Sequence, residues 1–203
     1  APLPVVFALG GVLLLPSEAA LARAIGEGLI VTAAVIAGIR LLHHLCRDKG
    51  LAERHFRWSD ALRHALRREL AWLTFVALPL IFLVVVAARS GEPAISAAVG
   101  RPAFIGLNLA LTLFLYRLFR AESPLIGALG EKHLATQTRF LWFPLLLAVP
   151  LGLITLSAIG YQYTALFLAR RLHTTLWLLF GLVVLRALIT RWLYVIDRRR
   201  RFE

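Results

Sequence analysis

The stretch WLTFVALPLIFLVVVAA at residues 72–88 decides the fold class, because it is almost entirely apolar and contains no charged side chain. A helix needs roughly twenty such residues to cross the hydrocarbon core of a bilayer. Pro79 lies inside the stretch, and a proline is tolerated within a membrane-spanning helix, which it often bends. The stretch therefore predicts a transmembrane helix.

Further apolar blocks lie on either side of residues 72–88. The 203-residue chain is 60% hydrophobic, with a mean hydropathy of +0.77, whereas soluble domains are about 45–50% apolar. We therefore expect an all-α, polytopic transmembrane helix bundle with about six spans. Residues 89–101 are expected to form a short loop, with Pro102 opening the next helix. The predicted spans cover residues 3–15, 19–45, 72–88, 102–119, 140–160 and 174–196.

A strongly basic segment precedes the span at residues 72–88. Within residues 58–71, apolar side chains recur every three or four positions and arginines fall between them. This pattern predicts an amphipathic helix that lies in the membrane interface. Residues 165–172 form a second candidate interfacial stretch. The side chains expected to sense lipid and tension are Trp58, Leu62, Arg63, Leu66, Arg67 and Trp72.

The distribution of positive charge predicts the topology. A formal net charge of +12 would suggest a nucleic-acid partner in a soluble protein. Here the Lys and Arg residues cluster between apolar blocks, so we expect a lipid bilayer as the partner and no nucleic acid. One set of loops carries sixteen of the 23 Lys and Arg residues, and the opposite set carries five. Because basic loops stay in the cytoplasm, both termini are predicted to be cytoplasmic.

The sequence contains no methionine and begins at Ala1 within an apolar stretch. A complete membrane protein of this hydrophobicity normally starts with methionine and contains several more. We therefore expect the 203 residues to be one transmembrane helical domain taken from a longer polypeptide. The single cysteine, Cys46, excludes an intrachain disulfide.

Catalytic and metal-binding patterns are absent from the sequence. His43, His44, Cys46, His55 and His64 are of types that bind zinc, but their spacing matches no familiar zinc motif and their surroundings are basic. No H-E-x-x-H, G-x-S-x-G or P-loop motif is present. We therefore predict no enzyme activity, no metal and no cofactor.

Two polar side chains fall inside predicted spans. Arg186 suggests either a gating or pore function, or a long side chain that reaches the headgroups. Asn108 is expected to hydrogen-bond to another helix. Close helix contacts are predicted at three pairs of small residues four positions apart: Ala34 and Gly38, Gly106 and Ala110, and Ala148 and Gly152.

Residues 50–73 read GLAERHFRWSDALRHALRRELAWL. The G-L-A-x-x-H-F-x-W run, followed by L-R-R-E-L-x-W-L, resembles the inner-membrane domain of the large MscS-related mechanosensitive channels of Gram-negative bacteria, of the MscK and miniconductance types. Three further stretches are similar to the same domain. These are GRPAFI at residues 100–105, LYRLF at residues 115–119, and RRLHTTLWLLFGLVVLRALITRWL at residues 170–193.

The resemblance implies a multi-pass domain of the bacterial inner membrane. In that family the domain belongs to a long polypeptide that also has a pore helix and a cytoplasmic β-rich vestibule and assembles as a homoheptamer. The implied function is to sense membrane tension for a channel that releases ions on osmotic downshock. Two alternatives remain open: a subunit of a transporter or flippase, and a membrane anchor or scaffold for a partner complex.

Overall fold

The computed structural model describes residues 3–45, 60–120 and 139–200, and within them all regular secondary structure is helical. The predicted all-helical fold is therefore confirmed. The elements are α1 (Leu3–Leu14), α2 (Ala20–Leu45), α4 (Asp60–Arg89), α5 (Pro93–Ile95), the π-helical turn η1 (Ser96–Gly100), α6 (Arg101–Phe119), α9 (Arg139–Ile159) and α10 (Gln162–Arg200).

Four helical stretches in the described part of the chain are long and apolar enough to cross a membrane. They are Ala20–Leu41, His64–Arg89, Pro93–Phe119 and Trp142–Ile159, and Leu3–Leu14 forms a shorter apolar helix. Each coincides with one of the predicted blocks, and the last block, residues 174–196, lies within α10. The number of spans is thus roughly as predicted.

The chain divides after Gly160 into two units. Residues 1–160 contain the helices from α1 to α9, and residues 161–203 contain α10. Gly160 has φ +112°, a conformation that residues with a Cβ rarely adopt. Its N–H donates to the carbonyl of Ser157 at 3.2 Å, so the glycine ends α9 with a satisfied backbone.

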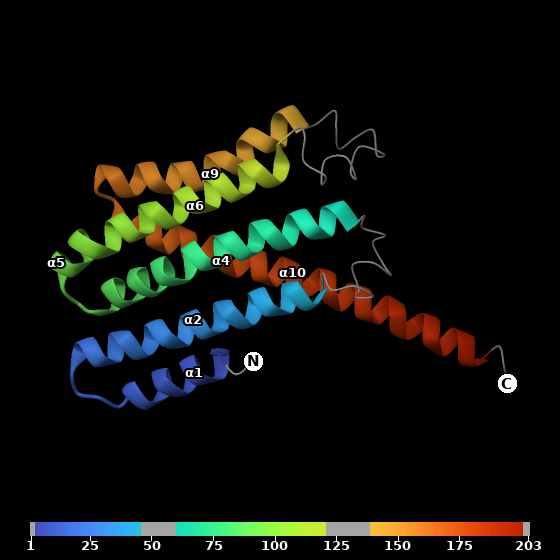
Figure 1. The fold of residues 1–203 in the computed structure, drawn as a ribbon, viewed down its shortest axis with the longest axis horizontal. Helices are drawn as coiled ribbons and strands as arrows, with labels where there is room; N and C mark the ends of the chain where they lie inside the picture. Colours follow the sequence, from blue (N-terminus) through green and yellow to red (C-terminus); the bar gives the residue numbers. More distant parts are fainter. Residues whose placement is uncertain (1–2, 46–59, 121–138, 201–203) are drawn as a thin grey trace. The chain divides into compact units, whose positions relative to one another are not determined.

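The helices of the first unit follow one another as an antiparallel layer (Figure 1). α1 packs on α2, α2 on α4, α4 on α6 and η1, and α6 on α9. Much of each helix therefore remains uncovered, and only 17–33% of the residues in the candidate spans are buried. Phe75, for example, is 83% exposed. Such an apolar surface is unfavourable in water but suits contact with lipid chains.

The antiparallel order gives the layer two distinct ends (Figure 1). The last turn of α2, the first of α4, the last of α6 and the first of α9 lie at one end, which we call the Glu69 end after a residue near the start of α4. The turns at residues 15–19 and 90–92 lie at the other end, which we call the Glu27 end after a residue near the start of α2.

The helical segment that contains residues 102–119 begins earlier than predicted, at Pro93. Glu92 is extended, and Pro93 takes the first helical position, where its missing N–H is harmless. The preceding turn is closed by Ser90, whose Oγ donates to the carbonyl of Ala87 at 3.0 Å and accepts from the N–H of Glu92 at 3.4 Å. Gly91, with φ +75°, allows the reversal.

Pro102 therefore lies within a continuing helical segment and does not start it. The wider turn η1 comes immediately before it, and the N–H of Arg101 donates to the carbonyl of Ser96, five residues earlier. Such π turns accommodate local irregularities within a helix. The predicted loop at residues 89–101 is thus reduced to the short turn at residues 90–92.

Two helices continue through the junctions between predicted interfacial stretches and predicted spans. α4 runs from Asp60 through residues 72–88, and α10 runs through both residues 165–172 and residues 174–196. No glycine or proline occurs at either junction to end the helix. With 39 residues, α10 is about 58 Å long at a rise of 1.5 Å per residue. It therefore exceeds the roughly 30 Å thickness of a hydrocarbon core.

Candidate functional site

An ion pair joins α2 to α4 at the Glu27 end of the layer. Nε of Arg89 lies 2.9 Å from Oε2 of Glu27, and both side chains are partly exposed. Arg89 is the last residue of α4, where the helix dipole also favours a positive charge. The chain runs from α2 to α4 at the opposite end of the layer. At the Glu27 end, where no loop joins these two helices, the ion pair links them instead.

Glycines bring neighbouring helices into close contact. A Cβ at Gly28 of α2 would lie 2.8 Å from Cγ2 of Val86 on α4. A Cβ at Gly11 of α1 would lie only 2.6 Å from the carbonyl oxygen of Gly26 on α2. By contrast, a Cβ at Gly152, which belongs to one of the predicted small-residue pairs, would meet nothing within 4 Å. Spacing within one helix therefore did not identify these contacts.

At the Glu69 end, one carboxylate faces two arginines. Glu69 of α4 is 9% exposed. Its Oε1 lies 3.6 Å from Nη2 of Arg68, and its Oε2 lies 3.8 Å from Nη1 of Arg117 on α6. Both distances exceed those of charge-assisted hydrogen bonds, and Oε2 makes no hydrogen bond in the described structure. This ionic contact again closes the unconnected end of a helix pair, here α4 and α6.

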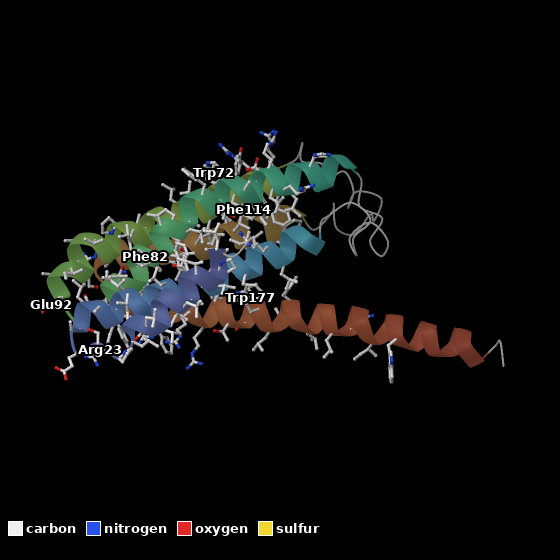
Figure 2. The ribbon with its side chains drawn as sticks, turned by 60° about the horizontal axis from the view of Figure 1, so that its bottom comes forward. Arg23, Trp72, Phe82, Glu92, Phe114 and Trp177 are labelled. Atoms are coloured by element: carbon white, nitrogen blue, oxygen red, sulfur yellow. The ribbon has the colours of Figure 1, made fainter. Side chains whose placement is uncertain are left out.

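Aromatic rings extend this contact across three helices. The Arg117 guanidinium carbon lies 5.2 Å from the centre of the Trp72 ring, a cation–π arrangement. Figure 2 shows Trp72 and Phe82 at separate levels along α4, with Trp72 nearer the Glu69 end. We call Arg68, Glu69, Trp72 and Arg117 the Glu69 cluster. Two ring pairs continue from α6 to α9, Tyr116 with Phe143 at 6.3 Å and Phe119 with Trp142 at 5.4 Å.

Half of the predicted lipid-sensing set falls where side chains are not described. Trp58 lies outside the described residues, and Leu62 and Arg63 belong to the first turns of α4, whose side chains are not described. Their roles stay predictions. Cys46 and His55 also lie outside, and within the part of the chain that is described no three His, Cys, Asp or Glu residues gather into a group able to hold a metal.

The other half of that set lies on α4 beside Glu69. Leu66 is half-buried, Arg67 is exposed, and the half-buried Trp72 belongs to the Glu69 cluster. The sequence analysis did not single out Glu69 as a site residue. Its position was nevertheless informative, since it follows Leu66 by three residues and precedes Leu73 by four, which places it on the apolar stripe.

Asn108 is 4% exposed, but its hydrogen bond stays within its own helix. Nδ2 donates to the carbonyl of Phe104 at 2.9 Å, so the expected bond to another helix is replaced by a local one. Local bonding gives a buried polar side chain a hydrogen-bond partner within its own helix. Four threonine hydroxyls in the first unit likewise donate to the carbonyl four residues earlier: Thr32, Thr74, Thr112 and Thr155.

Replacing Asn108 with leucine is therefore expected to change the stability of the domain by less than about 1 kcal/mol. The substitution keeps a similar volume and removes a bond that links no two helices. Thermal unfolding in detergent measures the effect. Asn108→Asp should destabilise the protein clearly, because it buries a charge at the same position. A large loss of stability in Asn108→Leu would contradict the local bonding described here.

The second unit, α10, carries apolar side chains around much of its circumference. Leu178 and Leu182 are 70% and 63% exposed. Trp177 donates from Nε1 to Nε2 of His173 at 2.8 Å, one turn earlier in the same helix. Arg186 lies on the exposed surface of α10. Its predicted gating or pore function stays a prediction.

Comparison with known proteins identifies the family. The family profile described as "Mechanosensitive ion channel inner membrane domain 1" matches residues 1–203. The chain belongs to this family. The resemblance carried by residues 50–73 is thereby confirmed, and the inner-membrane domain is part of a membrane-protein family of ion channels.

Two curated relatives of this inner-membrane domain come from Escherichia coli (strain K12). The miniconductance mechanosensitive channel MscM is 30% identical over 185 residues, which cover 90% of the domain and 16% of MscM. The mechanosensitive channel MscK is 32% identical over 150 residues, which cover 74% of the domain and 13% of MscK. The domain thus spans at most about a sixth of the length of these two mechanosensitive channels. No solved structure matches it significantly.

Proposed function

We propose that this domain senses membrane tension for a mechanosensitive ion channel, and thereby promotes ion efflux on osmotic downshock. The layer of helices supports the proposal, because each candidate span is at most 33% buried and the remainder is available to lipid. A large lipid-facing surface makes the free energy of the domain depend on bilayer thickness. Tension favours a state of larger in-plane area, and a channel coupled to that state opens more often.

The ionic contacts would oppose such an expansion. α2 and α4 are held at their unconnected end by Glu27 and Arg89, and α4 and α6 by the Glu69 cluster. The Glu27–Arg89 pair joins partly exposed side chains and is therefore weak, about 0–1 kcal/mol. The contacts of Glu69 are longer than charge-assisted hydrogen bonds. The opposite ends of both helix pairs, by contrast, are joined covalently. In this mechanism the unconnected ends separate first when the bilayer is stretched.

The proposed topology is multi-pass in a bacterial inner membrane, with both termini in the cytoplasm. The Glu69 end is then cytoplasmic, and four arginines lie there: Arg67, Arg68, Arg117 and Arg120. A homo-oligomer, a heptamer by the family resemblance, would place several copies of the layer around one pore. The conducted ions and the pore belong to the full-length channel.

The interfacial role of residues 58–71 is tested by patch-clamp recording from the full-length channel that contains this domain. Trp58→Glu combined with Leu62→Glu is expected to raise the tension needed for opening, because each change removes about 2 kcal/mol of apolar contact with lipid. His64→Glu introduces one carboxylate at an exposed position of the polar face and should leave the threshold close to wild type. An unaltered threshold in the double variant would exclude this segment from tension sensing.

A further inference from the structure

We propose that the Glu69 cluster binds the phosphate of an anionic glycerophospholipid, in addition to holding α4 against α6. The proposal rests on the proposed function, since it names the lipid class that this membrane-embedded layer recognises. The ligand contacts would come from Arg68 and Arg117, whose guanidinium groups both lie near Glu69.

The charges of the cluster favour an anion. Two guanidinium groups face one carboxylate, which leaves a local surplus of one positive charge. The separations of 3.6 and 3.8 Å are too long for Glu69 to accept strong hydrogen bonds from Arg68 or Arg117. A guanidinium carries five N–H donors, and its forked geometry can bind a phosphate through two hydrogen bonds at once, as it can a carboxylate. The side chains of Arg68 and Arg117 are 79% and 44% exposed, so a ligand can reach both.

The ring of Trp72 adds to the fit. Its cation–π contact holds the Arg117 guanidinium at the cluster without a hydrogen-bond acceptor, so the N–H groups of Arg117 can still donate to a phosphate. The exposed Arg67 lies beside the cluster on α4, and the exposed Arg120 follows α6 at the same end. Both arginines raise the positive electrostatic potential around the Glu69 cluster, although neither belongs to it.

The position of the cluster identifies a lipid as the source of the phosphate. Trp72 begins the uncharged run at residues 72–88, so the cluster lies where a span passes from headgroups into hydrocarbon. Phe75, one turn further along α4, is 83% exposed and available to an acyl chain. A bound phospholipid would thus contact the arginines with its headgroup and α4 with its chains.

The Glu27 end supplies a matched contrast. There a single arginine meets a single carboxylate, and the 2.9 Å separation is that of a formed hydrogen bond. Arg89 lies on the same helix as Arg68 and is 50% exposed, similar to Arg117. Its charge is already neutralised by Glu27, so it should contribute little to phosphate binding.

Native mass spectrometry of the full-length channel with added phosphatidylglycerol tests the site. Arg68→Ala combined with Arg117→Ala is expected to weaken binding about tenfold, whereas Arg89→Ala should leave it unchanged. Glu69→Gln should strengthen binding severalfold, because it removes the competing negative charge. A merely structural Glu69 would not give that increase. Arg117→Lys keeps the charge without the forked geometry and should give an intermediate affinity.

Several results would overturn the assignment. Equal weakening by Arg89→Ala would indicate a general effect of charge, and equal binding of phosphatidylcholine would show that the anionic headgroup is not recognised. Displacement by millimolar inorganic phosphate would indicate free phosphate as the ligand. A channel that still gates with tension but binds no phosphatidylglycerol would refute only this site. A channel that binds the lipid but ignores tension would refute only the proposed function.

Discussion

Replacing Glu69 with lysine is expected to lower the tension at which the full-length channel opens and to reduce the stability of the domain. The new ammonium would lie next to Arg68 and Arg117 at a position that is 9% exposed. An uncompensated buried charge costs about 3–5 kcal/mol. The repulsion would separate α4 from α6 at their unconnected end, which is the movement proposed to accompany stretching. Patch-clamp recording and thermal unfolding measure the two effects.

The control for this experiment is Glu92→Lys, which makes the same charge change at an exposed residue of the turn at residues 90–92. It should leave both the threshold and the stability near wild type. Adding Arg117→Glu to Glu69→Lys restores opposite charges between α4 and α6 and should recover part of the threshold. A wild-type threshold in the single Glu69→Lys variant would show that the Glu69 cluster does not restrain opening.

The second large effect is expected at the contact between α1 and α2. In Gly11→Leu, the first carbon of the new side chain would lie 2.6 Å from the carbonyl oxygen of Gly26 and 2.7 Å from Cγ1 of Ile30. A backbone atom cannot move aside as a flexible side chain can, so the helices must separate. Overpacking of this kind costs about 1–3 kcal/mol, which lowers the unfolding temperature by several degrees.

Gly152→Leu is the matched control, because a Cβ at Gly152 meets nothing within 4 Å. The same side chain is added to a membrane helix in both variants, so helix propensity and hydrophobicity change alike. Thermal unfolding in one detergent compares the two directly. Identical unfolding temperatures would mean that the close approach of α1 and α2 is not needed for stability.

Features of the fold that depend on local chemistry could be predicted from the sequence. The uncharged run at residues 72–88 predicted the core of α4. A helix that spans a bilayer needs a long apolar stretch, and the length of such a stretch can be read directly from the sequence. The start of the helical segment containing α6 was predicted at Pro102 but lies at Pro93. Both prolines satisfy the rule for a first helical position, so the rule alone does not choose between them. The choice depends on the Ser90 turn and on η1, which no local pattern indicated.

The candidate site depended on contacts between helices, and these were beyond local patterns. Only the packing of α6 on α4 places the Arg117 guanidinium over Trp72 and beside Glu69. Similarly, the close partner of Gly11 is Gly26 on the next helix, and spacing within one helix cannot reveal it. Such contacts depend on which face each helix turns toward its neighbour.

The length of α10 has a mechanical consequence. An unbroken helix of about 58 Å works as a lever arm, because a small rotation at its base is multiplied along its length. A rotation of about 5° would displace the far end by about 5 Å, comparable to the rise of one helical turn. Minor angular rearrangements near Gln162 would therefore reach Arg200 as a large translation.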